Sequence, residues 1–397
     1  MINRYDYINE IKKFIDVPVV KILAGVRRCG KSTILDMIKE ELISNGKDEV
    51  SIISRKYNEI QFEDMTAKEM YSDLTKEFKA GQRYYLFLDE LQEIKGWEKV
   101  VNDIFEKYNI DIYVTGSNSK LMSSEISTYL TGRYVLIPVY TLSFKEYLEF
   151  KNTGKDNKIM FNEYIQYGGF PVVGISNLDT QSAYQVVEGI YSAVITRDIS
   201  NRHQIRNKEL FDRVVRYLIE NVGKTFSANT IVNFLKNEKR KLSVEAVYNY
   251  LKWLNEAFII YPCSRYDMQG KTILKTQEKY YLSDISIKYS QFGFKPSYVA
   301  SMLENIVYLE LRRRGYETYI GKNQSKEIDF IGIRREEKIY IQVCRDIPED
   351  SDRELGNLME IKDHYHKYLV TMDNLAKGNE NGIEIVHIAD FLLKAEW

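Results

Sequence analysis

The sequence predicts an α/β fold in which a parallel-sheet domain comes first, a helical domain follows and a second α/β domain comes last. Short apolar runs at residues 19–24 and 84–88 alternate with helical patterns in the first part of the chain. Apolar residues at helical spacing dominate the middle, and strand-like segments return from residue 317 onward. The chain has 397 residues, which is enough for about two to four domains.

Composition narrows the class of protein. The chain is 44% hydrophobic and 28% charged, as globular proteins are. Its net charge of −1 means that nucleic-acid affinity would need a local basic patch. The cysteines, Cys29, Cys263 and Cys344, lack zinc-site spacing and indicate a reducing compartment. No signal peptide is recognised and no apolar run approaches the roughly 18 residues of a membrane span. We therefore expect a cytoplasmic protein without a membrane partner.

The segment Gly25–Ser32 satisfies the P-loop pattern G-x-x-x-x-G-K-[ST]. An apolar run at 19–24 precedes it and a helical pattern at 33–42 follows, which is the strand–loop–helix context of a phosphate site. Backbone amides and the helix N-terminus would face phosphate oxygens. The pattern therefore predicts an ATP site. The residues expected to contact the nucleotide are Gly25, Val26, Arg27, Arg28, Cys29, Gly30, Lys31, Ser32 and Thr33.

The chemistry expected at this site needs a cation, a metal ion and a base. Lys31 is predicted to reach the β- and γ-phosphates, and the Ser32 hydroxyl to ligate Mg²⁺. The apolar run at 84–88 ends in Asp89 and Glu90. Because parallel strands present their carboxyl ends at the ligand edge, Asp89 is expected to help hold Mg²⁺. Glu90 is expected to act as general base toward water.

Polar residues after the next strand-like run offer further contacts. The run at 110–115 leads into Ser117 and Asn118, and either could contact the γ-phosphate or orient water. Simple turn chemistry is the alternative. We take Asn118 as the catalytic candidate. Arg4 is a further candidate for contact with the base or ribose.

The order of these motifs resembles the AAA+ superfamily. The resemblance implies that Arg133, directly before the apolar run at 134–139, is a finger completing a neighbouring subunit's site, which requires self-association. A structural salt bridge is the alternative role. Further motifs resemble a narrower prokaryotic family of AAA-type ATP-binding proteins with a C-terminal domain of unknown function. These motifs lie at residues 25–32, 86–92, 115–119, 130–133, 142–147 and 167–171.

The middle of the chain predicts a winged helix. Three helical patterns begin near Lys208, Ser227 and Ser243, with the two serines as N-caps, and a hairpin follows around residues 266–271. A basic run precedes the third helix, comprising Lys236, Lys239, Arg240 and Lys241. Phosphate contacts need such charge, so DNA is one predicted partner. Winged helices also bind proteins, and the third helix has few base-reading residues.

The last hundred or so residues resemble the restriction-endonuclease-like PD-(D/E)XK fold. The resemblance aligns Glu304, Asp329 and Gln342 with its Mg²⁺-binding positions. Cys344 stands where that family has a lysine, and a neutral thiol cannot supply an ammonium charge. We therefore do not expect this domain to catalyse hydrolysis.

Together these patterns predict four regions: an AAA-type P-loop ATPase domain (1–143), a helical lid or linker (144–205), a winged-helix domain (206–292) and a PD-(D/E)XK-like domain (293–397). The predicted function is binding and hydrolysis of ATP with Mg²⁺, with the nucleotide state controlling contacts to DNA or a protein. The alternatives are an ATP-gated DNA nuclease using Asp329, or a slow nucleotide-switched protein-interaction module.

Overall fold

The structure, a computed structural model, describes residues 2–119, 129–130, 132–270, 272–323, 326–347, 352–375 and 377–397. Thr131 and Lys271, which belong to predicted motifs, lie outside the described residues. The chain divides into an N-terminal unit, Met1–Thr141 with Glu256–Phe258, and a C-terminal unit, Leu142–Asn255 with Ile259–Trp397. Across the described ranges, every helix is too short or too polar to cross a bilayer.

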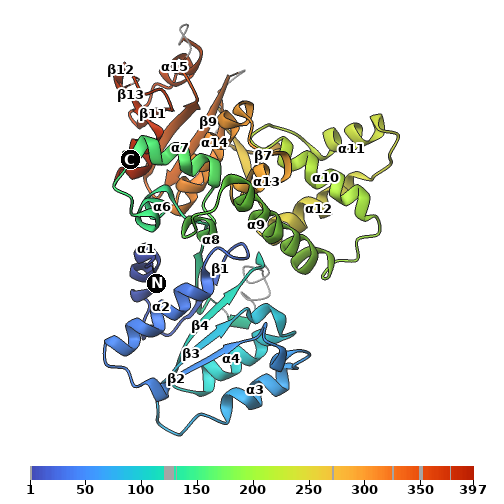
Figure 1. Cartoon of the computed structure of the whole chain (residues 1–397), viewed down its shortest axis with the longest axis vertical. Coiled ribbons are helices and arrows are strands. Elements are labelled where there is room, and N and C mark those ends of the chain that lie inside the picture. Colours follow the sequence, from blue (N-terminus) through green and yellow to red (C-terminus); the bar gives the residue numbers. More distant parts are fainter. Residues whose placement is uncertain are drawn as a thin grey trace. The chain divides into compact units, whose positions relative to one another are not determined.

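The N-terminal unit is built on a five-stranded parallel sheet with the order β2-β3-β4-β1-β5 (Figure 1). Its strands are β1 (Val20–Ala24), β2 (Ile52–Lys56), β3 (Tyr84–Asp89), β4 (Ile110–Gly116) and β5 (Tyr134–Pro138). Every residue of β1, β3 and β4 is buried, which explains their continuous apolar runs. The predicted parallel sheet is thus confirmed, with β1 between β4 and β5.

Helices cover both faces of this sheet. They are α1 (Tyr5–Lys12), α2 (Lys31–Ser44), α3 (Ala67–Thr75) and α4 (Trp97–Lys107), with short 3-10 turns at Glu49–Ser51, Ile60–Phe62 and Leu91–Glu93. The chain crosses from β1 to the edge strand β2 and then returns through β3 and β4. Because such crossovers are right-handed, α2 covers one face and α3 and α4 cover the other (Figure 1).

A buried ion pair interrupts the apolar interior of the sheet. Lys21 of β1 and Asp111 of β4 are 0% and 1% exposed and bind each other directly. Lys21 also donates to the Val17 carbonyl (3.0 Å), and Asp111 accepts from the Tyr113 hydroxyl (2.8 Å). Burial lowers the pKa of Lys21, against the attraction of Asp111. Since an unpaired buried charge is costly, the pair accounts for two polar residues in otherwise apolar strands.

The C-terminal unit begins with helices, within the segment predicted to be a helical lid or linker (144–205). They are α6 (Phe144–Lys151), α7 (Asn157–Tyr167), α8 (Pro171–Gly174) and α9 (Thr180–Ala193), continued by a π-helix (Val194–Ser200). Ser143 and Glu146 form a capping box that starts α6. In the π-helix Arg197 is exposed, whereas Asp198 is buried with Arg202 3.7 Å away.

The turn between α7 and α8 requires its two glycines. A Cβ atom at Gly168 would lie 2.2 Å from Asp284 Oδ1, and Gly168 has φ +75°. The Gly169 amide donates to Asp284 Oδ2 (2.8 Å), and its carbonyl accepts from the Leu142 amide (2.6 Å). The turn therefore joins the start of this unit to the segment after β7, and larger residues would clash there.

Three helices and a hairpin occupy the middle of the chain. The helices are α10 (Lys208–Glu220), α11 (Ala228–Asn237) and α12 (Val244–Glu256). The hydroxyls of Ser227 and Ser243 accept hydrogen bonds from the first turns of α11 and α12, as predicted. The hairpin consists of β6 (Ile260–Asp267) and β7 (Thr272–Leu282).

The hairpin belongs to an eight-stranded mixed sheet with the order β12-β13-β11-β10-β9-β8-β6-β7. The other strands are β8 (Glu317–Asn323), β9 (Lys326–Arg334), β10 (Glu337–Cys344), β11 (His366–Thr371), β12 (Gly378–Glu380) and β13 (Ile383–His387). The remaining helices are α13 (Ser286–Phe292), α14 (Val299–Arg313), α15 (Asp352–Met359), α16 (Ile388–Leu393) and a 3-10 turn at Pro296–Tyr298. Because β6 pairs with β8, one sheet runs across the predicted limit at residue 292. The four-region division stays a prediction.

Candidate functional site

The P-loop connects the end of β1 to the start of α2. A Cβ atom at Gly25 would lie 2.0 Å from the Val139 carbonyl oxygen, so only glycine permits this close approach. Gly30 has φ +102° and Arg28 has φ +67°, both in the left-handed region. Lys31 is the first residue of α2. The loop backbone therefore turns tightly at the sheet edge and leads directly into a helix N-terminus.

Lys31 is held across the mouth of the loop. Its side chain is 3% exposed, and Nζ donates to the carbonyls of Gly25 (2.9 Å) and Val26 (3.1 Å). The same atom lies 4.0 Å from Glu90 Oε1. The ammonium group thus sits between the P-loop and the acidic end of β3.

Asp89 and Ser32 are brought together as the sequence predicts. The Ser32 hydroxyl donates to Asp89 Oδ1 (3.0 Å), so two oxygen atoms suited to Mg²⁺ are neighbours. The Thr115 hydroxyl donates to the same carboxylate oxygen and accepts from the Glu90 amide (2.9 Å). This role of Thr115 was not predicted from the sequence. The indication in the sequence is the position of Thr115 near the end of β4, the strand that pairs with β3.

Glu90 lies just beyond β3 with φ +53°, which turns its side chain toward the P-loop side of the edge. Its Oε2 accepts hydrogen bonds from Ser117 Oγ (3.2 Å) and from Gln92 Nε2. Burial acts to raise the pKa of Glu90, but the charges of Lys31 and Arg27 and these two hydrogen bonds outweigh it. The pKa of Glu90 is therefore below its usual value, and the side chain is ionised at neutral pH.

The turn after β4 supplies a partner for Glu90. Of the two residues left open by the sequence, Ser117 is the one whose hydroxyl binds the Glu90 carboxylate. Asn118 is adjacent and 1% exposed. The catalytic role of Asn118 stays a prediction. Because Ser117 contacts the Glu90 carboxylate, we add it to the catalytic candidates.

The remaining P-loop residues differ in what they can offer a ligand. Val26 and Cys29 are buried, so their side chains pack into the domain and only their backbone faces the loop. Burial raises the pKa of the Cys29 thiol. Arg27 is half-buried near Glu90, whereas Arg28 and Thr33 are exposed. Contact of these side chains with a nucleotide stays a prediction.

The buried side chain of Arg4 binds the backbone of the P-loop. It is 2% exposed, and its guanidinium donates to the carbonyls of Cys29 (2.8 Å) and Thr141 (3.5 Å). It also lies 4.4 Å above the Tyr7 ring. A long-range contact of this kind has no local sequence signal. The guanidinium thus stabilises the loop backbone, whereas the sequence suggested contact with base or ribose.

Arg133 lies at the other end of the sheet. It directly precedes β5, whereas the P-loop follows the carboxyl end of the parallel neighbour β1. The five residues of β5 separate the two edges by about 16 Å. Its guanidinium binds Glu106 Oε1 (2.7 Å) and Asn102 Oδ1 (3.1 Å). Arg133 therefore cannot act on the P-loop of its own chain.

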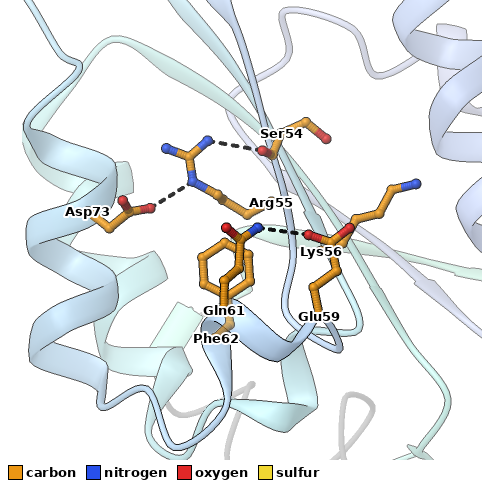
Figure 2. Close-up of a pocket in the computed structure, with 7 residues that line it drawn as sticks. All are labelled: Ser54, Arg55, Lys56, Glu59, Gln61, Phe62 and Asp73. Carbon is orange, nitrogen blue, oxygen red and sulfur yellow. Dashed lines mark hydrogen bonds and ion pairs between the residues drawn. The ribbon is translucent and has the colours of Figure 1, made fainter.

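A polar pocket of about 410 Å³ lies at the end of β2, next to α3 (Figure 2). Arg55 donates from Nε to Asp73 Oδ2 (2.7 Å) and also binds Glu77. Its charge is thus neutralised by two carboxylates, of which Asp73 lines the pocket. The lining residues are Ser54, Arg55, Lys56, Glu59, Gln61, Phe62 and Asp73.

The residues matched to the endonuclease-like pattern lie close together in the C-terminal unit. Asp329 of β9 donates from its amide to Gln342 Oε1 (3.3 Å) and accepts at Oδ2 from the Val343 amide (2.8 Å). Glu304 of α14 approaches the same region. Cys344 ends β10 and is half-buried.

The basic run before α12 is only partly neutralised. Lys236, Lys239 and Lys241 are exposed. Arg240 is half-buried and binds Glu209 through Nη2 (2.6 Å). Three lysines thus face solvent on neighbouring turns of the chain.

The strand order, the glycine loop and the acidic end of β3 define the N-terminal unit as a nucleotide-binding P-loop domain of AAA type. Comparison with known families agrees. Residues 18–148 match an AAA domain model, and residues 159–298 match a domain of unknown function.

Relatives extend over nearly the whole chain. An uncharacterised protein of Haemophilus influenzae is 35% identical over 399 residues and covers 99% of both chains. An uncharacterised protein of Methanocaldococcus jannaschii is 31% identical, covering 94% of this chain and 85% of its own length. The chain belongs to the same family as these proteins. Its own match to the AAA domain model confirms the AAA-type family predicted from the motifs.

A solved structure supports the fold. The Walker-type ATPase of Pyrococcus abyssi superposes with a TM-score of 0.50 at 15% identity, covering 73% of this chain and 95% of its own. At this identity the similarity concerns the fold alone.

Proposed function

We propose that this protein is an Mg²⁺-dependent ATPase whose nucleotide state controls how its C-terminal unit contacts DNA or a protein. The observation that carries the proposal is the gathering of four side chains at one sheet edge. Ser32 lies 3.0 Å from Asp89, and Lys31 lies 4.0 Å from Glu90. A cation, two metal-suited oxygens and an ionised carboxylate are the groups that phosphoryl transfer to water needs.

These residues fit the nucleotide and metal that the fold implies. The P-loop amides and Lys31 would hold the phosphates, and Ser32 and Asp89 would hold Mg²⁺. Bound Mg²⁺ supplies positive charge that neutralises the phosphates. Glu90 accepts a proton from water, with Ser117 fixing its carboxylate and Asn118 at the same turn.

Replacing Lys31 with alanine tests the proposal. We expect the wild-type protein to release phosphate from ATP only with Mg²⁺, and Lys31→Ala to fall to background. The variant lacks the cation at the loop mouth, and alanine cannot reach the phosphates. Phosphate release over time is the measurement. Lys39→Ala, on the same helix but paired with Asp36, is the matched control and should retain activity. Full turnover in Lys31→Ala would overturn the proposal.

We propose Arg133 as a finger acting on the site of a neighbouring copy of the chain, and therefore self-association. Its position at the far end of β5 supports action between chains over action within one. A guanidinium stabilises charge on a transferred phosphoryl group well because it is permanently charged and rigid. Its ion pair with Glu106 supports the alternative role, a structural salt bridge.

The partner proposed for the C-terminal unit is DNA. We propose that α10–α12 with the β6–β7 hairpin form a winged helix, and that the sheet beyond it has an endonuclease-like fold. The order of three helices and a hairpin supports the first, and the exposed Lys236, Lys239 and Lys241 support phosphate contact.

Removing these three lysines tests the DNA contact. We expect wild-type protein to retard duplex DNA at low salt, and the triple alanine variant to bind more weakly with a salt slope reduced by about three. Gel shifts across a salt series measure both. The weakening should be similar for different DNA sequences, because lysine–phosphate contacts carry no base information.

Three exposed lysines of the N-terminal unit provide the control for charge alone. The triple variant Lys68→Ala, Lys79→Ala, Lys95→Ala should bind DNA as the wild type does. No retardation of any duplex even at low salt would favour the alternative, a nucleotide-switched protein-interaction module.

A further inference from the structure

A lysine from the hairpin occupies the acidic cluster of the C-terminal sheet. Lys279 of β7 is 5% exposed at its side chain. Its Nζ lies 2.9 Å from Glu327 Oε1, 3.2 Å from Glu304 Oε2 and 3.8 Å from Asp329 Oδ1. One ammonium group therefore contacts three carboxylates contributed by α14 and β9.

Other polar atoms of the cluster also form hydrogen bonds. Glu304 Oε2 accepts from the Tyr281 hydroxyl (3.2 Å) as well as from Lys279. Asp329 Oδ2 accepts from a backbone amide, and Gln342 Oε1 accepts from the Asp329 amide. The site is thus arranged around an internal cation.

A divalent metal does not fit this arrangement. Mg²⁺ and its analogues bind carboxylate oxygens at about 2.0–2.6 Å and would have to occupy the place of the ammonium. Burial acts to lower the pKa of Lys279, but the three carboxylates raise it above its usual value. The ammonium group and a divalent ion would therefore compete for one place among the same three carboxylates.

We propose that Lys279 takes the place of the metal ion in this domain, so that the acidic cluster is closed to divalent cations and cuts no phosphodiester. The inference concerns the C-terminal unit alone and does not depend on ATP hydrolysis. It also explains how Glu304, Glu327 and Asp329 can stay together without a metal: the lysine offsets their mutual repulsion.

Mn²⁺ binding to the full chain without nucleotide tests this inference. In the wild type we expect no Mn²⁺ site that depends on Asp329, so wild type and Asp329→Asn should bind equal amounts. Lys279→Met keeps a side chain of similar length but removes the charge. In this variant we expect about one additional Mn²⁺ per protein molecule. That extra site should disappear in Lys279→Met, Asp329→Asn. Electron paramagnetic resonance of free Mn²⁺ measures all four proteins.

Each outcome decides the matter. Less Mn²⁺ bound by Asp329→Asn than by the wild type would overturn the proposal, because it would reveal an open site. A folded Lys279→Met protein that gains no Mn²⁺ would also overturn it. If Lys279→Met folds only when Mn²⁺ is present, as circular dichroism would show, the metal is replacing the lysine, which supports the proposal. If Lys279→Met does not fold at all, the comparison of wild type with Asp329→Asn decides.

Discussion

Glu90→Gln is expected to bind ATP normally and to turn it over about 10²- to 10⁴-fold more slowly. The side chain keeps its size, and the Glu90 amide keeps its hydrogen bond to Thr115. What is lost is the ionised carboxylate, since a neutral amide cannot accept a proton from water. Phosphate release under single-turnover conditions, with nucleotide affinity measured separately, distinguishes the two effects.

Glu93→Gln is the matched control for this substitution. Glu93 lies three residues further on and is exposed. Glu93→Gln removes the same charge outside the proposed catalytic set, so its turnover should equal that of the wild type. Wild-type turnover in Glu90→Gln would show that another group activates the water.

Local patterns were sufficient to predict the P-loop and the sheet that carries it. Gly25 to Ser32 lies between an apolar run and a helical pattern, and each of these signals comes from adjacent residues. The burial of whole strands is likewise visible as unbroken apolar runs. The proximity of Asp89 and Ser32 could be predicted because ligand-binding residues meet at the carboxyl ends of parallel strands. Asp89 ends β3, and Ser32 belongs to the loop and helix that follow β1.

Contacts that depend on tertiary register could not be predicted. Arg4 binds the Cys29 carbonyl from 25 residues away, and Lys279 binds Glu304 at the same separation. Neither contact lies within one helix or one strand, so no local period predicts it. The absence of the family's lysine at Cys344 was visible in the sequence. The position of Lys279 beside Glu304 was not, because it depends on β6 pairing with β8.

Arg133→Ala is expected to lower ATP turnover by on the order of 10³-fold, the effect of removing a finger that stabilises the transferred phosphoryl group. Nucleotide affinity should change little, because Arg133 is far from the P-loop of its own chain. Under the structural alternative, any loss would come instead from breaking the Glu106 ion pair. Glu106→Gln separates the two, since it removes the ion pair and leaves the guanidinium. Normal turnover in Glu106→Gln, together with loss in Arg133→Ala, would support the finger.

Mixing two inactive variants shows whether the arginine acts between chains. Glu90→Gln retains Arg133, and Arg133→Ala retains Glu90, so a mixed assembly contains complete sites wherever the first lends its arginine to the second. Phosphate release should therefore recover when the two are combined and should rise with total protein concentration. Arg133 cannot act on the site of its own chain, because about 16 Å of β5 separates it from the sheet edge that carries the P-loop. A mixture as inactive as its parts would reject the shared site and leave Arg133 as a surface ion pair of the sheet.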